Sequence, residues 1–137
     1  METVDDVVGY EVPVDDLDRL SYAVIGAAIT VHRALGAGHG ESVYQKALCL
    51  ELQALGVRHE AEHEYDVFYR GQAVGRGRVD VLVEDVLIVE IKTVSETLSV
   101  HVAQTISYLR AKGLRRALLI NFNVRKLSDG VRRIVHN

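Results

Sequence analysis

The sequence predicts an α/β domain in which a mixed β-sheet carries helices on both faces, in the element order ααβββαββ. Two segments with apolar residues at helical spacing precede three segments rich in β-branched and aromatic residues. A third helical segment then separates these from two further strands. A chain of 137 residues, 48% hydrophobic and 26% charged, has the size and composition of one globular domain. We assign residues 1–14 to an acidic lead-in and residues 15–137 to this single domain.

The two N-terminal helices are expected over residues 17–35 and 41–55. The first keeps apolar residues at helical spacing and can be capped by Asp15 or Asp16. The glycine-rich run GAGHG then separates the two helices, because glycine favours the conformations that end a helix. Glu41 therefore stands at the start of the second helix, directly behind a loop.

Three antiparallel strands are expected over residues 57–68, 73–83 and 86–92, with tight reversals between them. The first of these segments alternates, which predicts a strand with one face exposed to water. One side of this strand would carry His59, Ala61, His63, Tyr65 and Val67, and the other side would carry Glu60, Glu62, Glu64 and Asp66.

The remaining elements are a helix over residues 96–112, a fully apolar strand over 117–121 and a short strand over 131–135. Gly113 follows the helix and is expected to end it. The core-facing stripe of this third helix is expected to be Leu98, Val102, Ile106 and Leu109.

Cysteine usage and hydropathy exclude several classes of protein. The single cysteine, Cys49, excludes an intramolecular disulfide and any site built on a cysteine pair. The longest uncharged apolar run, Tyr22–Val31, has about half the length of a membrane span. The N-terminus METVDDVV lacks the basic and apolar regions of a signal peptide. We therefore expect a cytoplasmic protein with no membrane partner.

The segment VDVLVEDVLIVEIK, residues 79–92, contains the residues with the strongest chemical signal. Its two apolar runs flank an acidic reversal, so antiparallel pairing places Asp80 across from Val89 or Glu90. Glu90 and Lys92 are two residues apart and share one face of a strand. Buried charges are costly unless they are paired or bound to a metal. The end of this hairpin is therefore a candidate site.

Two carboxylates and one backbone carbonyl are oxygen ligands that suit Mg²⁺, which also retains several waters. Asp80, Glu90 and the carbonyl of Ile91 can supply them. Lys92 could then orient an attacking water or stabilise developing negative charge. The alternative interpretation of the same residues is a salt bridge between Lys92 and Asp80 or Glu90 at the strand end.

The formal net charge of −3 conceals a segregation of charge along the chain. Residues 1–20 carry seven acids and one base, whereas residues 110–137 carry eight bases and one acid. The C-terminal quarter could therefore face phosphates, or it could be an ordinary solvated surface. The bases of this quarter are Arg110, Lys112, Arg115, Arg116, Arg125, Lys126, Arg132 and Arg133.

The pattern of Asp80, nine intervening residues, and then Glu90-Ile91-Lys92 resembles the active-site signature of the PD-(D/E)XK nuclease superfamily. The residues Gly38-His39-Gly40-Glu41-Ser42-Val43-Tyr44 also resemble the signature of the GxxExxY protein family within that superfamily. Further similar features are Arg78-Val79-Asp80, the trio His101, Gln104 and Tyr108, and Leu119-Ile120-Asn121-Phe122. The superfamily's proline is absent, because Val79 precedes Asp80.

The resemblance implies a restriction-endonuclease-like fold with a defined set of site residues. Asp80, Glu90 and the Ile91 carbonyl would bind Mg²⁺, for which Mn²⁺ could substitute, and Lys92 would be the catalytic lysine. Glu41 would be an accessory ligand or would hold a metal-bound water, although an acid at a helix start can also serve only the helix dipole. Substrate contacts are expected from Arg78 and from Gln104, Tyr108 and His101, although these three could also be only a half-exposed helix flank. The segregation of charge adds Arg115 and Arg116 as expected substrate contacts.

The run His59-Glu60-Ala61-Glu62-His63 spells the HExxH motif of zinc peptidases. That motif works on a helix, where its two histidines lie one turn apart. The surrounding alternation predicts a strand, on which Glu60 points away from the two histidines and cannot act as their general base. We therefore assign no zinc site here.

The sequence thus predicts a Mg²⁺-dependent nuclease that hydrolyses phosphodiester bonds of DNA or RNA. The alternative is a nucleic-acid-binding or assembly module that retains the nuclease fold without turnover. A domain of this size leaves no room for separate recognition elements. Specificity would then come from loops, from a partner protein or from a homodimer.

Overall fold

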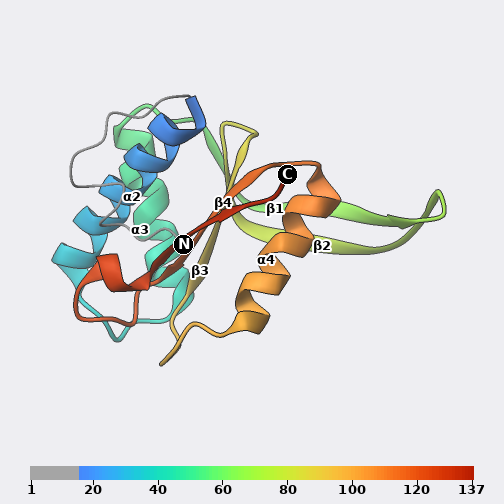
Figure 1. Cartoon of the computed structure of the whole chain (residues 1–137). Helices are drawn as coiled ribbons and strands as arrows, with labels where there is room; N and C mark the ends of the chain where they lie inside the picture. Colours follow the sequence, from blue (N-terminus) through green and yellow to red (C-terminus); the bar gives the residue numbers. More distant parts are fainter. Residues whose placement is uncertain (1–15) are drawn as a thin grey trace.

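A computed structural model of the chain describes residues 16–137 (Figure 1), so the predicted acidic lead-in lies outside the described residues. Five strands form one sheet in the order β1-β2-β3-β4-β5. In chain order the elements are α2 (Asp16–Leu35), α3 (Glu41–Ala54), β1 (His59–Tyr69), β2 (Gln72–Val83), β3 (Leu87–Lys92), α4 (Ser99–Lys112), β4 (Arg116–Asn121), the 3₁₀ turn η1 (Leu127–Gly130) and β5 (Val131–Val135).

The sheet is mixed, as the sequence predicts. Strands β1, β2 and β3 form an antiparallel meander, β3 and β4 pair in parallel, and β4 and β5 are antiparallel. Parallel neighbours need a crossover connection, and α4 supplies it between β3 and β4. The predicted fold class and the order ααβββαββ are confirmed.

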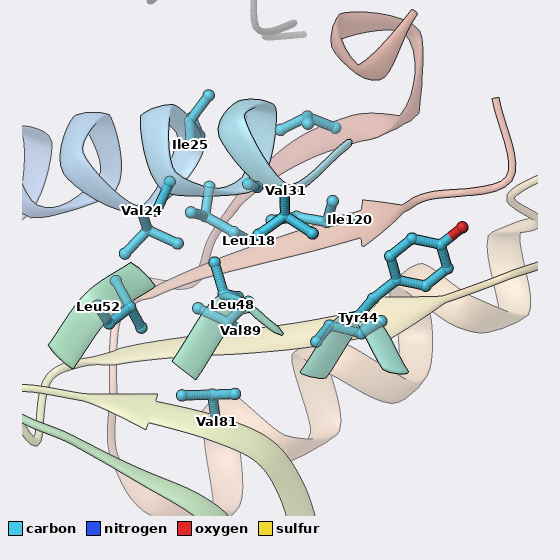
Figure 2. Close-up of a cluster of buried hydrophobic side chains, with 14 of the residues drawn as sticks. Val24, Ile25, Val31, Tyr44, Leu48, Leu52, Val81, Val89, Leu118 and Ile120 are labelled. Carbon is cyan, nitrogen blue, oxygen red and sulfur yellow. The ribbon is translucent and has the colours of Figure 1, made fainter. Parts of the chain in front are cut away.

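Helices cover both faces of the sheet (Figure 1). On one face, α2 and α3 pack on alternate residues of the central strands, and Figure 2 shows this cluster with Tyr44, Leu48 and Leu52 of α3 against Val81 and Val89. On the other face, α4 packs through Leu109 against the intervening strand residues, such as Ile88 and Leu119. None of the described helices is long and apolar enough to cross a lipid bilayer.

Tyr44 anchors the loop before α3 to this core. Its ring is fully buried and stacks on Phe122 with a centroid separation of 4.5 Å. Its hydroxyl donates to the carbonyl of Gly36 at 2.5 Å and accepts from the backbone N–H of His39 at 3.2 Å. These contacts of Tyr44 fix the position of the loop, and therefore that of Glu41, the first residue of α3, relative to the sheet.

The first helix is joined to the last two strands by a partly buried ion-pair network. Asp18 contacts Arg116 at 2.7 Å and Arg133 at 2.8 Å, and all three side chains are about one-fifth exposed or less. The hydrogen bond from Arg116 is the main reason why the pKa of Asp18 lies below its ordinary value. The network connects α2 with β4 and β5.

Two details of the predicted elements are wrong. Strand β1 does not have one buried face, because from Val67 onward both sides of it are exposed beyond the edge of the helical layers. The stripe of α4 does not begin at Leu98, which precedes the helix and is 48% exposed. The buried residues of α4 are Thr105 and Leu109, and Val102 and Ile106 pack around them.

Replacing Gly130 by alanine is expected to destabilise the fold by about 2 kcal/mol, because a Cβ atom there would overlap the carbonyl oxygen of Asn121 in the adjacent strand. Gly26 is the matched control, since it is an exposed helical glycine with open space where a Cβ atom would stand. Alanine at position 26 should raise the stability by about 1 kcal/mol. Urea unfolding of the two variants measures both effects, and equal shifts would contradict the close packing at Gly130.

Candidate functional site

The strands β2 and β3 diverge where the predicted site residues lie. Regular pairing extends only from Val83↔Leu87 to Val81↔Val89, so the next opposed positions are Asp80 and Glu90. This confirms the predicted register of the hairpin.

Where β2 and β3 diverge, hydrogen bonds from backbone N–H groups to side-chain carboxylates replace the backbone–backbone hydrogen bonds of the sheet. The backbone N–H of Asp80 donates to Oε2 of Glu90 at 2.8 Å, and the backbone N–H of Ile91 donates to Oδ2 of Asp80 at 2.7 Å. Each bond uses one carboxylate oxygen, so the second oxygen of each group can accept a further ligand. The two carboxylates are therefore fixed at the fork between the strands.

The side chains of Glu90 and Lys92 lie on the α4 side of β3. Side chains alternate along a strand, and Val89 and Ile91 belong to the cluster under α2 and α3. The carbonyl of Lys92 accepts the N–H of Phe122, which follows β4, at 2.9 Å. Successive carbonyls of a strand point to opposite neighbours, so the carbonyl of Ile91 points to the β2 side, towards Asp80.

A cavity of about 220 Å³ lies on the other side of the fork, between α3 and the strands. Gln45 of α3 donates from Nε2 to the backbone carbonyl of Asp80 at 2.8 Å, which ties the helix to β2 beside the site. Nothing in the sequence marks Gln45 beyond its position one residue after the GxxExxY pattern. The cavity is lined by Glu41, Ser42, Gln45, Glu62, Arg78, Asp80 and Ile91.

Burial and mutual repulsion perturb the two central carboxylates. Glu90 is 4% exposed, and burial together with the neighbouring charge of Asp80 raises its pKa to about 8. Burial also raises the pKa of Asp80, against the opposing effect of the hydrogen bond from Ile91. A cation between these groups would favour their ionised forms.

The donor chemistry of the fork fits a hard divalent cation. Asp80, Glu90 and the carbonyl of Ile91 offer only oxygen atoms, which Mg²⁺ prefers. Glu41 lines the same cavity, yet among residues 16–137 no three carboxylate, imidazole or thiol side chains converge closely enough to form a ready-made ion cage. The fit therefore rests on two carboxylates, one carbonyl and water.

Helix α4 brings Tyr108 next to the fork. Burial, followed by the nearby charge of Glu90, raises the pKa of Tyr108 to about 12, so its hydroxyl stays protonated at neutral pH. Gln104 hydrogen-bonds to this hydroxyl. The ring of Tyr108 meets Tyr65 of β1 edge to face at 6.0 Å, and Tyr65 also lies near the charge of Glu90.

Sequence reasoning did not identify Tyr65 as a neighbour of Tyr108 and Glu90 at the candidate site. The signal for it was Gly77, its cross-strand partner, because a Cβ atom at Gly77 would overlap the Tyr65 ring. Only a glycine opposite allows the tyrosine to lie flat across β2.

His101 is held by its own helix. Its Nδ1 accepts the backbone N–H of Leu98 at 2.9 Å, which caps the first turn of α4. The sequence prediction did not foresee this capping contact, because it placed the helix start at Glu96, three residues before Ser99.

Arg78 lies at the cavity and forms an ion pair with Glu62 at 3.4 Å. Glu62 has a positive φ of 54°, which is rare for a residue other than glycine, and it faces Asp80 at a gap in the β1–β2 pairing. This irregularity turns Glu62 towards the cavity and was not predictable from the alternating sequence.

The HExxH run lies on β1, as predicted, and not on a helix. Nδ1 of His59 contacts the carbonyl of Val57 at 2.9 Å. The prediction that Glu60 points away from both histidines is wrong, because its carboxylate lies 3.0 Å from Nδ1 of His63. The two groups are not aligned for a hydrogen bond. The irregular backbone at Glu62 brings these two residues to the same side.

The predicted basic surface does not form one patch. Arg116 pairs with Leu87 at the start of β3, whereas Lys92 pairs with Asn121 at the opposite end. Arg115 therefore lies roughly 20 Å along the sheet from the level of Lys92. The assignment of Arg116 to substrate is wrong, because its guanidinium is 17% exposed and is bound to Asp18.

Comparison with known proteins agrees with the fold. The crystal structure of SSO0001 superimposes with a TM-score of 0.56 at 20% sequence identity, over 69% of this chain and 49% of that chain. The likeness at this identity concerns the fold, and the chain spans about half the length of SSO0001. No curated protein sequence matches the chain. The sequence model of the PD-(D/E)XK nuclease superfamily matches residues 18–134, so the chain belongs to that superfamily.

Proposed function

We propose that the protein is a Mg²⁺-dependent nuclease that hydrolyses phosphodiester bonds of DNA or RNA by attack of water. The observation that carries this proposal is the fork between β2 and β3. Its crossed hydrogen bonds hold Asp80 and Glu90 together, with Lys92 on the same strand face as Glu90. Membership of a nuclease superfamily supports the proposal.

The residues of the fork have distinct roles in this proposal. Asp80, Glu90 and the carbonyl of Ile91 would hold the divalent ion, and Glu41 would bind it through water. When bound, Mg²⁺ or Mn²⁺ would supply positive charge against the phosphate and would lower the pKa of water enough for hydroxide to be available at neutral pH. Lys92 orients the attacking water or stabilises the charge that develops on the phosphate. Tyr108, protonated and fixed by Gln104, donates a hydrogen bond to the substrate backbone.

Within the superfamily, we assign the chain to the GxxExxY protein family. The letters of residues 38–44 support this assignment. The structure gives them compatible roles, because Gly38 has a φ of 110° and Tyr44 is buried against Phe122. Glu41 is left at the cavity beside Asp80.

One observation favours a second candidate, a binding or assembly module without turnover. Backbone N–H groups already occupy one oxygen of both Asp80 and Glu90, and the described residues form no ready-made ion cage. A cleavage assay separates the two candidates. It requires single-stranded, duplex and branched DNA and RNA with Mg²⁺, Mn²⁺ or EDTA, and no metal-dependent cleavage on any of them would support the module.

Replacing Asp80 by asparagine is expected to weaken Mn²⁺ binding at least tenfold, because the change removes one ligand charge at nearly constant volume. The asparagine oxygen can still accept the N–H of Ile91, so the fold should persist. Asp66→Asn, an exposed acid on β1, is the control and should leave the binding unchanged. Isothermal calorimetry measures both, and equal Mn²⁺ affinity in the two variants would exclude Asp80 as a ligand.

A further inference from the structure

The outer part of the β1–β2 hairpin, residues 64–78, extends away from the domain as a two-stranded arm. Pairing of β2 with β3 stops at Val81, whereas pairing of β2 with β1 continues to Tyr69↔Gln72. Figure 1 shows this arm projecting past α4. Such an isolated pair of strands buries little apolar surface and needs a reason other than core packing.

The tip of the arm is aromatic, apolar and cationic. Phe68 is 64% exposed and Tyr69 is 68% exposed, the largest exposed aromatic surfaces of the described chain. Val74 beside them is 61% exposed. Arg70 is the only charged residue between positions 67 and 75. Exposed rings beside an arginine are suited to stacking on nucleobases and pairing with phosphate.

The position of Arg70 in the turn has a backbone cost. Arg70 and Gly71 both have positive φ angles, 51° and 78°, as a two-residue type I′ hairpin requires. Glycine, asparagine and aspartate adopt this conformation far more readily than arginine does. A charged side chain is thus placed at the extremity of the arm despite the strain.

The arm is continuous with the candidate site. From the fork, Tyr65 of the arm meets Tyr108 of α4. Further out, Val67 and Phe68 face Ser107, Arg110 and Ala111 of α4 across a groove of about 400 Å³. The tip lies seven or eight residues along β2 from Asp80, roughly 25 Å, which corresponds to roughly seven nucleotides of a stacked strand.

Charge argues against a second copy of this chain as the occupant of the arm. The edge strand β1 carries four exposed acids at alternate positions, and two such edges would bring like charges together. Two of these acids, Glu64 and Asp66, lie on the arm, and Arg76 balances their charge by pairing with Glu64 at 2.8 Å and with Asp66 at 3.5 Å. The tip beyond them has a net positive charge and is complementary to a polyanion. The four acids are Glu60, Glu62, Glu64 and Asp66.

We infer that the arm is a nucleic-acid-binding element, whose tip grips the substrate roughly 25 Å from the reaction centre. Phe68 and Tyr69 stack on bases, Arg70 pairs with a phosphate, and Arg110 guides the strand along the groove between the arm and α4. This inference rests on the proposed function, because the strand that the arm holds is the one that enters the fork.

Anisotropy with labelled single-stranded and duplex DNA and RNA of 6, 12 and 24 nucleotides tests the arm. All variants are made in the Glu90→Gln background with EDTA present, so that no probe is cleaved. Phe68→Ala/Tyr69→Ala should weaken binding of the best 24-nucleotide probe about tenfold and leave the 6-nucleotide probe nearly unchanged. Arg70→Gly should lower the slope of log affinity against log salt concentration by about one. The melting temperature of this variant should stay equal or rise. Leu50→Ala and Arg33→Gln, exposed positions on α3 and α2, are the controls.

The outcomes separate this inference from the proposed function. If the parent protein cleaves nucleic acid but the tip variants bind the long probes as tightly as the parent, the arm inference alone is overturned. A change of oligomeric state in the tip variants, with unchanged affinity per chain, would assign the tip to a protein contact and also overturn it. Absence of binding to every probe by the parent would overturn both.

Discussion

Replacing Lys92 by alanine is expected to reduce cleavage about a thousandfold while nucleic-acid affinity changes little. The side chain of Lys92 shares the α4 side of β3 with Glu90, so in the proposed mechanism it would contact the phosphate at the fork and no other part of the bound strand. Only one of several phosphate contacts is lost, and the salt slope of binding should fall by about one at most. Single-turnover cleavage and equilibrium binding, measured on the same substrate, separate the two effects.

Lys46 of α3 provides the matched control for this experiment. It is an exposed lysine on the opposite layer of the molecule, and Lys46→Ala should leave cleavage unchanged. Lys92→Arg retains the charge but not the compact ammonium group, so partial recovery would assign Lys92 to charge stabilisation. If Lys92→Ala lowers affinity as much as it lowers the cleavage rate, Lys92 acts in binding rather than in chemistry.

Replacing Glu90 by glutamine is expected to stabilise the metal-free protein on the order of 3 kcal/mol at pH 8. Burial and the charge of Asp80 raise the pKa of Glu90 to about 8, so ionised Glu90 is unfavourable in the fold. A glutamine oxygen can still accept the N–H of Asp80. In EDTA the melting temperature should therefore rise by roughly 10 °C.

The pH dependence of this effect has a definite sign. Below the ordinary glutamate pKa of 4.5, Glu90 is protonated in both the folded and the unfolded chain, and the two proteins should be equally stable. Between pH 4.5 and about 8 only the unfolded chain releases the proton, so the parent loses stability and the advantage of the variant grows. Above the folded pKa the advantage is constant.

Addition of metal should make the parent more stable than Glu90→Gln, which is the reverse of their order in EDTA. Mn²⁺ should raise the melting temperature of the parent, because it binds the folded state, and should have little effect on Glu90→Gln. Glu96→Gln, at an exposed glutamate before α4, is the control and should behave as the parent. A Glu90→Gln protein that is less stable than the parent at pH 8 would show that Glu90 contributes structural stability there.

The sequence by itself determined the elements and the pairing at the centre of the site. Strand and helix periodicities are local, so they predicted the order of the elements, and Gly113 correctly marked the end of α4. The short reversal at Glu84 and Asp85 set the hairpin register to within one residue, so Asp80 was placed across from Val89 or Glu90, and the structure selects Glu90. One apolar hairpin with three charged residues at its open end, Asp80, Glu90 and Lys92, was therefore sufficient to indicate the candidate site.

Only the tertiary structure decided which charged residues face that site. Arg116 is bound to Asp18, which is 98 positions away in the sequence, and Arg115 lies at the sheet end opposite to Lys92. Conversely, Glu62, through its irregular backbone, and the ring of Tyr65 both lie at the site, although the alternation of apolar and polar residues did not predict it. Periodicity predicts the face on which a residue lies, whereas its partner depends on which distant segments the packed layers bring into contact, because ion pairs and hydrogen bonds form only across a few ångströms.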